Sequence, residues 1–134
     1  MESIWKSWKE LNKAVANKKS IFFGKAEDWC DKTLHRISFP VEYIVDNNRN
    51  LEGTTFGDIP VYLPEKLKYE DKDKVYIIIT SGAYETIIPQ LKKYGFSEGV
   101  SFCCTPSMLN LKILSFCLFI FEQQGTLLTR SENL

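Results

Sequence analysis

The segment VYIIIT, residues 75–80, is a nearly continuous apolar run. A half-exposed strand alternates apolar and polar residues, whereas a strand that is covered on both faces is apolar throughout. Such a strand needs neighbours in a sheet and helices above and below that sheet. The run therefore predicts an internal strand of an α/β domain.

Strand and helix patterns alternate along the rest of the chain. Further strands are predicted at 20–23, 41–46, 59–63 and 99–104, and helices at 3–17, 26–37, 64–67 and 81–96. Because strands joined by helical crossovers pair in parallel with right-handed connections, this alternation favours one parallel sheet. We predict an α/β fold with a parallel sheet of about five strands and helices on both of its faces.

Three residues refine the helix boundaries. Pro64 suits the first turn of the helix at 64–67, since its missing N–H has no partner there. Gly95 is placed to end the helix at 81–96, and Pro89 is expected to kink that helix.

The chain is predicted to contain three segments. They are an N-terminal amphipathic helix (1–19), the α/β domain (20–106) and a C-terminal helical segment (107–134) that packs on the domain or on a partner. The first helix is inferred from Ile4, Trp8, Leu11 and Val15, which recur at helical spacing after Ser3, a predicted N-cap.

The most apolar run of the chain is ILSFCLFIF, residues 113–121. A membrane-spanning helix needs about 20 apolar residues, so this run is too short to span a bilayer. Its apolar side chains would surround the whole helix, and they must therefore be covered. The cover is either the sheet of this domain or a second chain.

Composition and charge exclude several classes of protein. The 134 residues are 44% hydrophobic and 25% charged, which is ordinary for one globular domain. Lys and Arg together number 17, as do Asp and Glu, and no basic stripe is present, which argues against nucleic acid as a partner.

The cysteine pattern argues against a metal site. The four cysteines form no CxxC pair, and there is one histidine, His35, to join them. Because the N-terminal segment lacks the apolar core of a signal peptide, we interpret the cysteines as reduced residues of a cytoplasmic protein.

Part of a dinucleotide-binding fingerprint follows the first strand. Gly24 and Asp46 have the spacing of the first glycine and the ribose-binding acid, but Ala26 and Trp29 stand where the other glycines belong. Two interpretations of Gly24 stay open, a turn residue and a ligand contact. Two interpretations also stay open for Asp46 and Asn47: they bind the hydroxyl groups of a ribose, or they form an ordinary turn.

Charges near Gly24 bear on the kind of ligand. Glu27 and Asp28 lie in the first helical turn, where carboxylates compete with a phosphate for the positive end of the helix dipole. Lys25 offsets one of them. We therefore expect a ligand at this turn to bind through hydroxyl or base contacts more than through phosphate.

The turn after the internal strand is the other candidate contact. Thr80, Ser81 and Gly82 follow residues 75–79, where they either cap the next helix or meet a ligand at the carboxyl edge of the sheet.

No catalytic set emerges from the sequence, and enzymatic activity stays open. Tyr62 and Lys66 have the Tyr-x-x-x-Lys spacing of short-chain dehydrogenases, but Pro64 interrupts helical geometry between them. The lone His35 is interpreted as a surface residue.

Four stretches carry a resemblance to a known family: IFFGKAEDW, EYIVDNN, EGTTFGDIPVYLPEKL and VYIIITSGAYETIIPQLKKYGF. In their order they resemble the Rossmann-like, CoA-binding-type domains attached to polysaccharide-biosynthesis and sugar-nucleotide enzymes. The resemblance covers roughly residues 20–104 and implies a Rossmann-like sheet. It further implies a nucleotide or sugar-nucleotide ligand, or an accessory role beside a catalytic domain. The matching positions are Gly24, Asp46, Gly53, Gly57, Thr80 and Ser81.

The function predicted from these observations is a nucleotide or nucleotide-sugar binding module. Its ligand, which is a nucleotide, a sugar nucleotide or NAD, is expected to contact Gly24, Lys25, Ala26, Asp46, Asn47, Thr80, Ser81 and Gly82. The alternative is a non-catalytic interaction domain with a degenerate nucleotide site, which forms a homodimer through the apolar run 113–121 or serves an attached catalytic domain.

Overall fold

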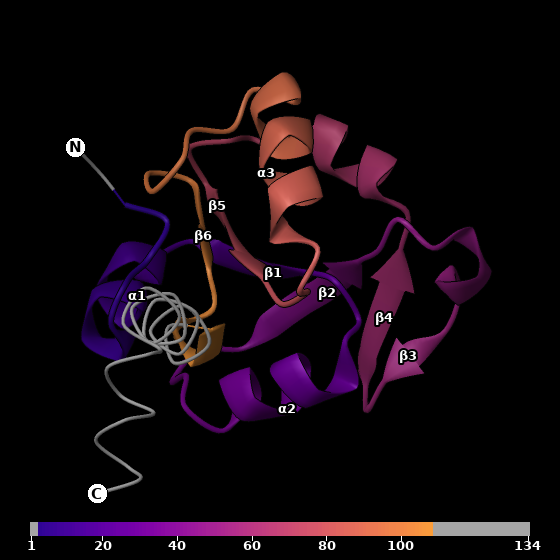
Figure 1. Cartoon of the computed structure of the whole chain (residues 1–134), viewed down its shortest axis with the longest axis horizontal. Coiled ribbons are helices and arrows are strands. Elements are labelled where there is room, and N and C mark those ends of the chain that lie inside the picture. The colour runs from indigo at the N-terminus through magenta and orange to yellow at the C-terminus, as the bar shows by residue number, and fades with distance from the viewer. Residues whose placement is uncertain (1–2, 109–134) are drawn as a thin grey trace, which may run out of the picture.

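The computed structural model describes residues 3–108, which form a six-stranded sheet with helices on both faces (Figure 1). The strand order is β3-β4-β2-β1-β5-β6. The strands are β1 (Lys19–Phe23), β2 (Val41–Val45), β3 (Thr55–Phe56), β4 (Ile59–Tyr62), β5 (Val75–Ile79) and β6 (Phe102–Cys104). The predicted α/β class is confirmed.

The sheet is parallel except at one edge. Strand β1 pairs with β2 and with β5, β2 pairs with β4, and β5 pairs with β6, all in parallel. Strand β3 is antiparallel to β4. The sequence prediction missed β3, because a strand of two residues is too short to show alternation and its residues lie within a polar loop.

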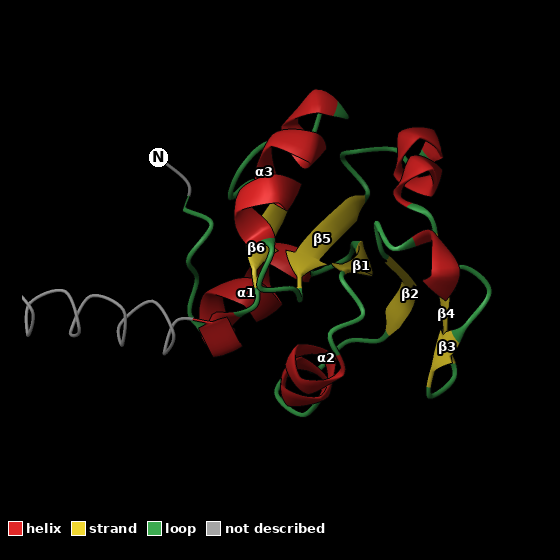
Figure 2. Ribbon diagram, turned by 45° about the vertical axis from the view of Figure 1, so that its right-hand side comes forward, coloured by secondary structure: helices red, strands yellow, loops and turns green. Residues whose placement is uncertain are grey.

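Helices cover the two faces of the sheet in pairs (Figure 2). On one face, α1 (Trp8–Val15) and α2 (Glu27–Leu34) pack against Phe22, Ile44 and Ile78. On the other, α3 (Tyr84–Lys93) and the 3₁₀ helix η2 (Pro64–Tyr69) pack against Phe23, Val45 and Ile77. Two further 3₁₀ helices are η1 (Arg49–Leu51) and η3 (Pro106–Met108). Strand β5 is buried throughout, as the apolar run predicts for an internal strand.

The N-terminal helix begins later than its sequence pattern predicts. Its N-cap is Ser7, not Ser3: the Ser7 hydroxyl accepts a hydrogen bond from the Glu10 N–H, and the Glu10 carboxylate accepts one from the Ser7 N–H. Residues 3–7 instead run beside β6, where the Cys104 N–H donates to the Ile4 carbonyl at 2.9 Å. The edge strand offers backbone groups that an extended segment satisfies, and the capping box fixes where the helix starts.

Two other helix signals agree with the structure. Pro64 lies in the first turn of η2. Pro89 lies inside α3, which continues to Lys93, and the kink expected there stays a prediction. Gly95 follows with a φ of +99°, the left-handed conformation that commonly ends a helix.

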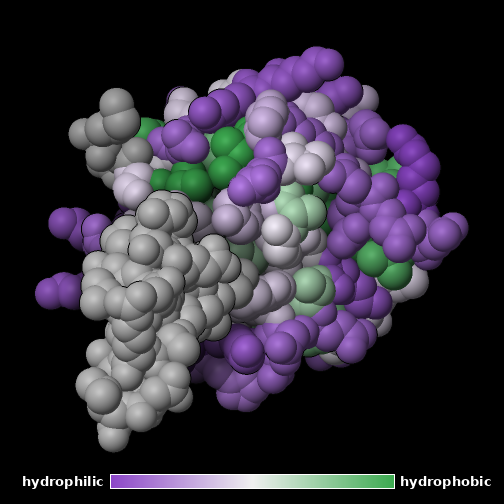
Figure 3. All heavy atoms as spheres, viewed as in Figure 1, coloured by the Kyte–Doolittle hydropathy of each residue, from purple (hydrophilic) through white to green (hydrophobic). Residues whose placement is uncertain are grey.

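The predicted C-terminal segment lies almost wholly outside the described residues. The apolar run 113–121 and Cys117 fall there, and so does the dimer surface predicted from that run. Within 3–108, no helix is long and apolar enough to cross a membrane. The large apolar side chains exposed in this part are Tyr62, Tyr69 and Val100. Figure 3 shows a mainly hydrophilic face with small, separate hydrophobic areas.

Candidate functional site

The strand order reverses between β1 and β5. From β1 the chain moves outward through β2 to β4 and then crosses back to β5 on the other side of β1. In open α/β sheets, ligands bind outside the carboxyl ends of the strands at such a reversal. The turns that follow β1 and β5 therefore form the candidate site, which holds the predicted contacts Gly24 and Thr80 to Gly82.

The two turns are hydrogen-bonded to each other. The Thr80 N–H donates to the Phe23 carbonyl at 2.9 Å, and the Thr80 hydroxyl donates to the Gly24 carbonyl at 2.7 Å. Both residues are buried. Thr80 thus holds the β1 turn in place, and its hydroxyl proton is already engaged.

The two turns lie so close together that residue 24 has no room for a side chain. The φ of Gly24 is +115°, and a Cβ atom added there would lie 2.5 Å from the Cβ of Ser81 and 3.1 Å from the Thr80 carbonyl oxygen. Both its conformation and its contacts exclude a side chain. The geometry therefore supports the interpretation of Gly24 as a turn residue, whether or not a ligand also contacts it.

Cys30, in α2, also contacts the turn at Gly24. Its thiol lies 3.2 Å from the Gly24 carbonyl, to which it donates a hydrogen bond. Burial raises the pKa of Cys30 to about 11, so the thiol stays protonated at neutral pH. In this state the thiol serves as a hydrogen-bond donor to the turn.

Asp46 links the β1 turn to the β2 turn. One carboxylate oxygen accepts the Lys25 N–H at 2.7 Å, and the other accepts the Asn48 N–H at 2.8 Å. The side chain is half-buried. Since an ionised carboxylate has about four acceptor positions, the two oxygens retain capacity for ligand hydroxyls.

The charges at the start of α2 are arranged as the sequence predicts. Glu27 and Asp28 are exposed in its first turn, and Asp28 pairs with Lys32 at 3.5 Å. The N-cap, Ala26, provides no side-chain hydrogen bond. The Lys25 ammonium lies 3.3 Å from the Thr54 hydroxyl, in the loop before β3, instead of over the helix end. The first turn therefore presents negative charge to a ligand.

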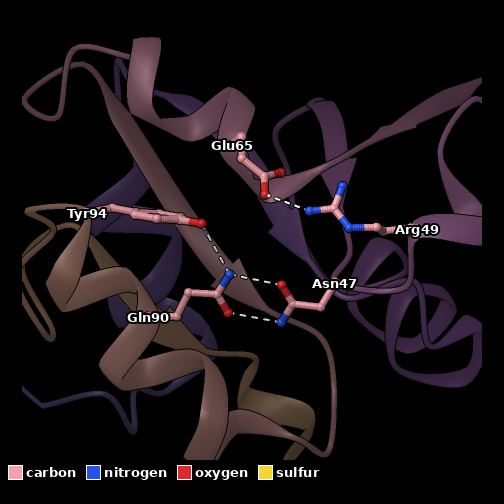
Figure 4. A network of polar contacts seen from close by, with 5 residues as sticks. All are labelled: Asn47, Arg49, Glu65, Gln90 and Tyr94. Atoms are coloured by element: carbon pink, nitrogen blue, oxygen red, sulfur yellow. Dashed lines mark hydrogen bonds and ion pairs between the residues drawn. The ribbon is translucent and has the colours of Figure 1, made fainter.

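Asn47, which the sequence proposes as a ligand contact, is paired with α3 (Figure 4). Its amide exchanges two hydrogen bonds of 2.9 Å with the amide of Gln90, and Gln90 also donates to the Tyr94 hydroxyl at 3.3 Å. These bonds connect the β2 turn to α3 across the β1 position. Sequence reasoning missed Gln90 and Thr54, because no local pattern shows which distant amide or hydroxyl a turn residue will meet.

A second polar contact lies beside this pair. Arg49 and Glu65 form an ion pair of 3.2 Å, and Figure 4 shows it near the Asn47–Gln90 contact. The other carboxylate oxygen of Glu65 is buried and has no hydrogen-bond partner within the described chain. Because Arg49 balances the charge of Glu65, the pair adds no net charge to the carboxyl edge.

The β5 turn leaves open space. The Ser81 hydroxyl accepts the Ala83 N–H at 3.1 Å, so it shapes the turn before α3, whose N-cap is Ala83. Gly82 is exposed, and a Cβ added there would meet no atom within 4 Å. Of the two glycines among the predicted contacts, Gly82 has free space around it and Gly24 has none.

The remaining candidates have structural roles. Tyr62 ends β4 and Lys66 lies in η2, with its ammonium over the Tyr62 ring at 4.5 Å from the ring centroid, which is a cation–π contact. His35 is exposed at the end of α2, as predicted. Residues 3–108 contain no group of three or more side chains placed to hold a metal ion.

Comparisons with known proteins identify the fold. No protein-family model and no curated protein matches this chain. A solved structure, that of RSP, a Rex-family repressor, is similar with a TM-score of 0.50 and 16% sequence identity, over 89% of this chain and 68% of that one. With the strand order and the parallel crossovers, this likeness shows a Rossmann-like fold. The Rossmann-like fold that the family resemblance implies is therefore confirmed. The likeness gives no support to the polysaccharide-biosynthesis type.

Proposed function

We propose that this chain is a nucleotide-binding module that holds its ligand at the carboxyl edge of the sheet, above β1 and β5. The observation that carries the proposal is the meeting of the Gly24 turn and the Thr80 to Gly82 turn where the strand order reverses. Asp46 follows the neighbouring strand β2, in the position from which an acid reaches ribose hydroxyls.

Each predicted contact has a role in this proposal. Asp46 accepts hydroxyl groups of the ligand with its unused acceptor positions, while it keeps the Lys25 N–H. The backbone from Lys25 to Ala26 and the open space at Gly82 line the ligand. Asn47 contributes once it exchanges its bonds to Gln90 for bonds to the ligand.

The finer assignment, a sugar nucleotide or an association with polysaccharide metabolism, rests on the resemblance of residues 20–104. It is compatible with the charge of the site, because a sugar brings hydroxyl groups to an edge where Glu27 and Asp28 disfavour phosphate. The Rex-family neighbour supports a Rossmann-like module in general and does not discriminate between ligands.

Isothermal titration with ATP, NAD, CoA and UDP-glucose tests the proposal. Asp46→Asn should weaken binding of the ligand found by about tenfold or more, because a hydrogen bond to a charged acceptor is lost. Asp71→Asn is a matched control. The Asp71 carboxylate accepts the Asp73 N–H, as Asp46 accepts the Asn48 N–H, but Asp71 precedes β5 and so lies at the opposite edge of the sheet.

Two results would contradict the proposal. One is the absence of binding of all four compounds to the wild-type chain. The other is an equal loss of affinity in the Asp46 and Asp71 variants, which would place the ligand away from the carboxyl edge.

A further inference from the structure

A groove of about 450 Å³ lies between α1 and the turn that precedes β6. Its lining includes Lys18, which comes just before β1, and Gly99 and Val100, which come just before β6. The groove therefore opens near the amino ends of the strands, at the edge opposite to the site described above. Helix α1, which forms its other wall, is the indigo helix in Figure 1.

The charge of the groove is unbalanced. Lys13 and Lys18 line it together with one acid, Glu10, and Lys6, which lies near that acid. The Glu10 carboxylate is engaged in the capping box, where the Ser7 N–H donates to it at 2.9 Å and lowers its pKa. In the described part of the chain, no carboxylate lies within ion-pair distance of Lys13 or Lys18.

The walls of the groove are held in position before any ligand arrives. The fully buried Tyr76 donates its hydroxyl proton to the Gly99 carbonyl at 3.0 Å, and the Lys18 ammonium lies over the Tyr76 ring. The Gly99 N–H donates to the Phe102 carbonyl at 2.8 Å. Lys6 is only 6% exposed. A preformed site of this kind loses little conformational entropy when it binds.

The lining also has an apolar part. Ala14 lies on the α1 wall, and Val100, on the facing turn, is 54% exposed. An apolar wall beside several ammonium groups suits a ligand with both a charged and an apolar portion. The volume is within the range of about 300–1,000 Å³ that is usual for small-molecule sites.

We propose that this groove binds a phosphate-bearing ligand, whose phosphate oxygens contact the ammonium groups of Lys13 and Lys18 and whose apolar portion contacts Val100. Lysine ammonium groups act as compact point charges that bind phosphate without a fixed planar geometry. The site is independent of the nucleotide proposed at the carboxyl edge. A free phosphate compound and a phosphorylated lipid headgroup share this chemistry.

The test uses the full chain, inorganic pyrophosphate as the probe and two-dimensional NMR with isothermal titration as the readouts. Pyrophosphate should shift the amide signals of Gly99 and Val100 and leave those of Gly24 and Gly82 in place. The double variant Lys13→Gln/Lys18→Gln should bind about tenfold more weakly, as expected from the loss of two partly exposed ion pairs.

The matched control is Lys9→Gln/Lys93→Gln, which removes the same charge from exposed lysines outside the groove lining. It should bind pyrophosphate nearly as well as the wild type, and Lys13→Arg/Lys18→Arg should retain binding. Equal weakening in both Gln variants, or no shift at Gly99 and Val100, overturns the proposal. Vesicles with and without phosphatidic acid then separate a headgroup from a free compound: pelleting that depends on the two groove lysines assigns the headgroup.

Discussion

The two edges of the sheet differ in how their polar groups are used. At the carboxyl edge, polar groups bind one another: Thr80 holds Gly24, Asp46 holds Lys25, and Asn47 is paired with Gln90. At the amino edge, the groove carries an excess of ammonium groups over carboxylates. The usual ligand position of this fold is at the carboxyl edge, whereas the groove lysines lie at the amino edge.

Helix direction explains part of this difference. Helices that connect parallel strands start at the carboxyl edge and end at the amino edge, so acids are favoured at the first edge and bases at the second. Glu27 and Asp28 at the start of α2 follow this rule. Helix α1 precedes the first strand and leads into it, so its last turn, which holds Lys13, also lies at the amino edge. Lys6 and Lys18 lie outside the last turn of α1, and the rule does not account for them. The comparison teaches that a Rossmann-like fold does not by itself decide where an anion is attracted.

The largest expected effect tests how tightly the carboxyl edge is closed. Gly24→Ala should lower the free energy of unfolding by about 3 kcal/mol, because it adds backbone strain and a clash with Ser81. Chemical denaturation measures the change. Gly82→Ala, at the same edge but in open space, should change stability by less than about 0.5 kcal/mol.

Adding Ser81→Gly to Gly24→Ala separates the two causes. The double variant removes the Cβ atom that would be struck at 2.5 Å but keeps the strained φ, so it should recover part of the loss. If the single Ala variant is as stable as the wild type, the close approach of the two turns is wrong.

The next effect concerns Asp46, whose carboxylate joins the turns of β1 and β2. Asp46→Asn should cost about 2 kcal/mol of stability, because the amide offers a single acceptor oxygen where the carboxylate serves two N–H groups. Thermal unfolding of this variant and of Asp71→Asn, which disturbs only one such bond, measures the difference in stability. Equal losses would show that the Asp46 bonds do not join the two turns.

A smaller effect sharpens the contrast in charge between the edges. Glu27→Gln/Asp28→Asn should strengthen binding of ATP at the carboxyl edge by about 1 kcal/mol, or about fivefold, because the competing charge at the helix start is removed. Isothermal titration gives the affinity, and NMR shifts at Gly82 report the edge. Unchanged or weaker binding would mean that these carboxylates point away from the ligand or contact it directly.

The smallest effect concerns the exposed amide pair. A double-mutant cycle with Asn47→Ala and Gln90→Ala should give a coupling energy of about 0.5 kcal/mol, as expected for hydrogen bonds that compete with water. Chemical denaturation of the wild type, the two single variants and the double variant provides the cycle. A coupling of zero would indicate that the Asn47 side chain is free for a ligand without cost.

The sequence by itself determined most of the elements and the class of fold. The apolar run at 75–79 specifies a strand covered on both faces, and the alternation of strand and helix periods specifies a parallel sheet. Pro64 and Gly95 mark a helix start and a helix end, because their backbones permit few alternatives. Each of these signals is local, so neighbouring residues suffice to express it.

Only the tertiary structure decided the contacts between elements. Residues 3–7 leave the predicted helix because β6 offers them backbone partners, and β3 exists because it pairs with β4. The partners of Asp46 and Asn47 and the groove near Lys18 combine residues far apart in the chain. A periodic pattern records which side of an element is buried and carries no information on which distant group it meets, so these features required the folded chain.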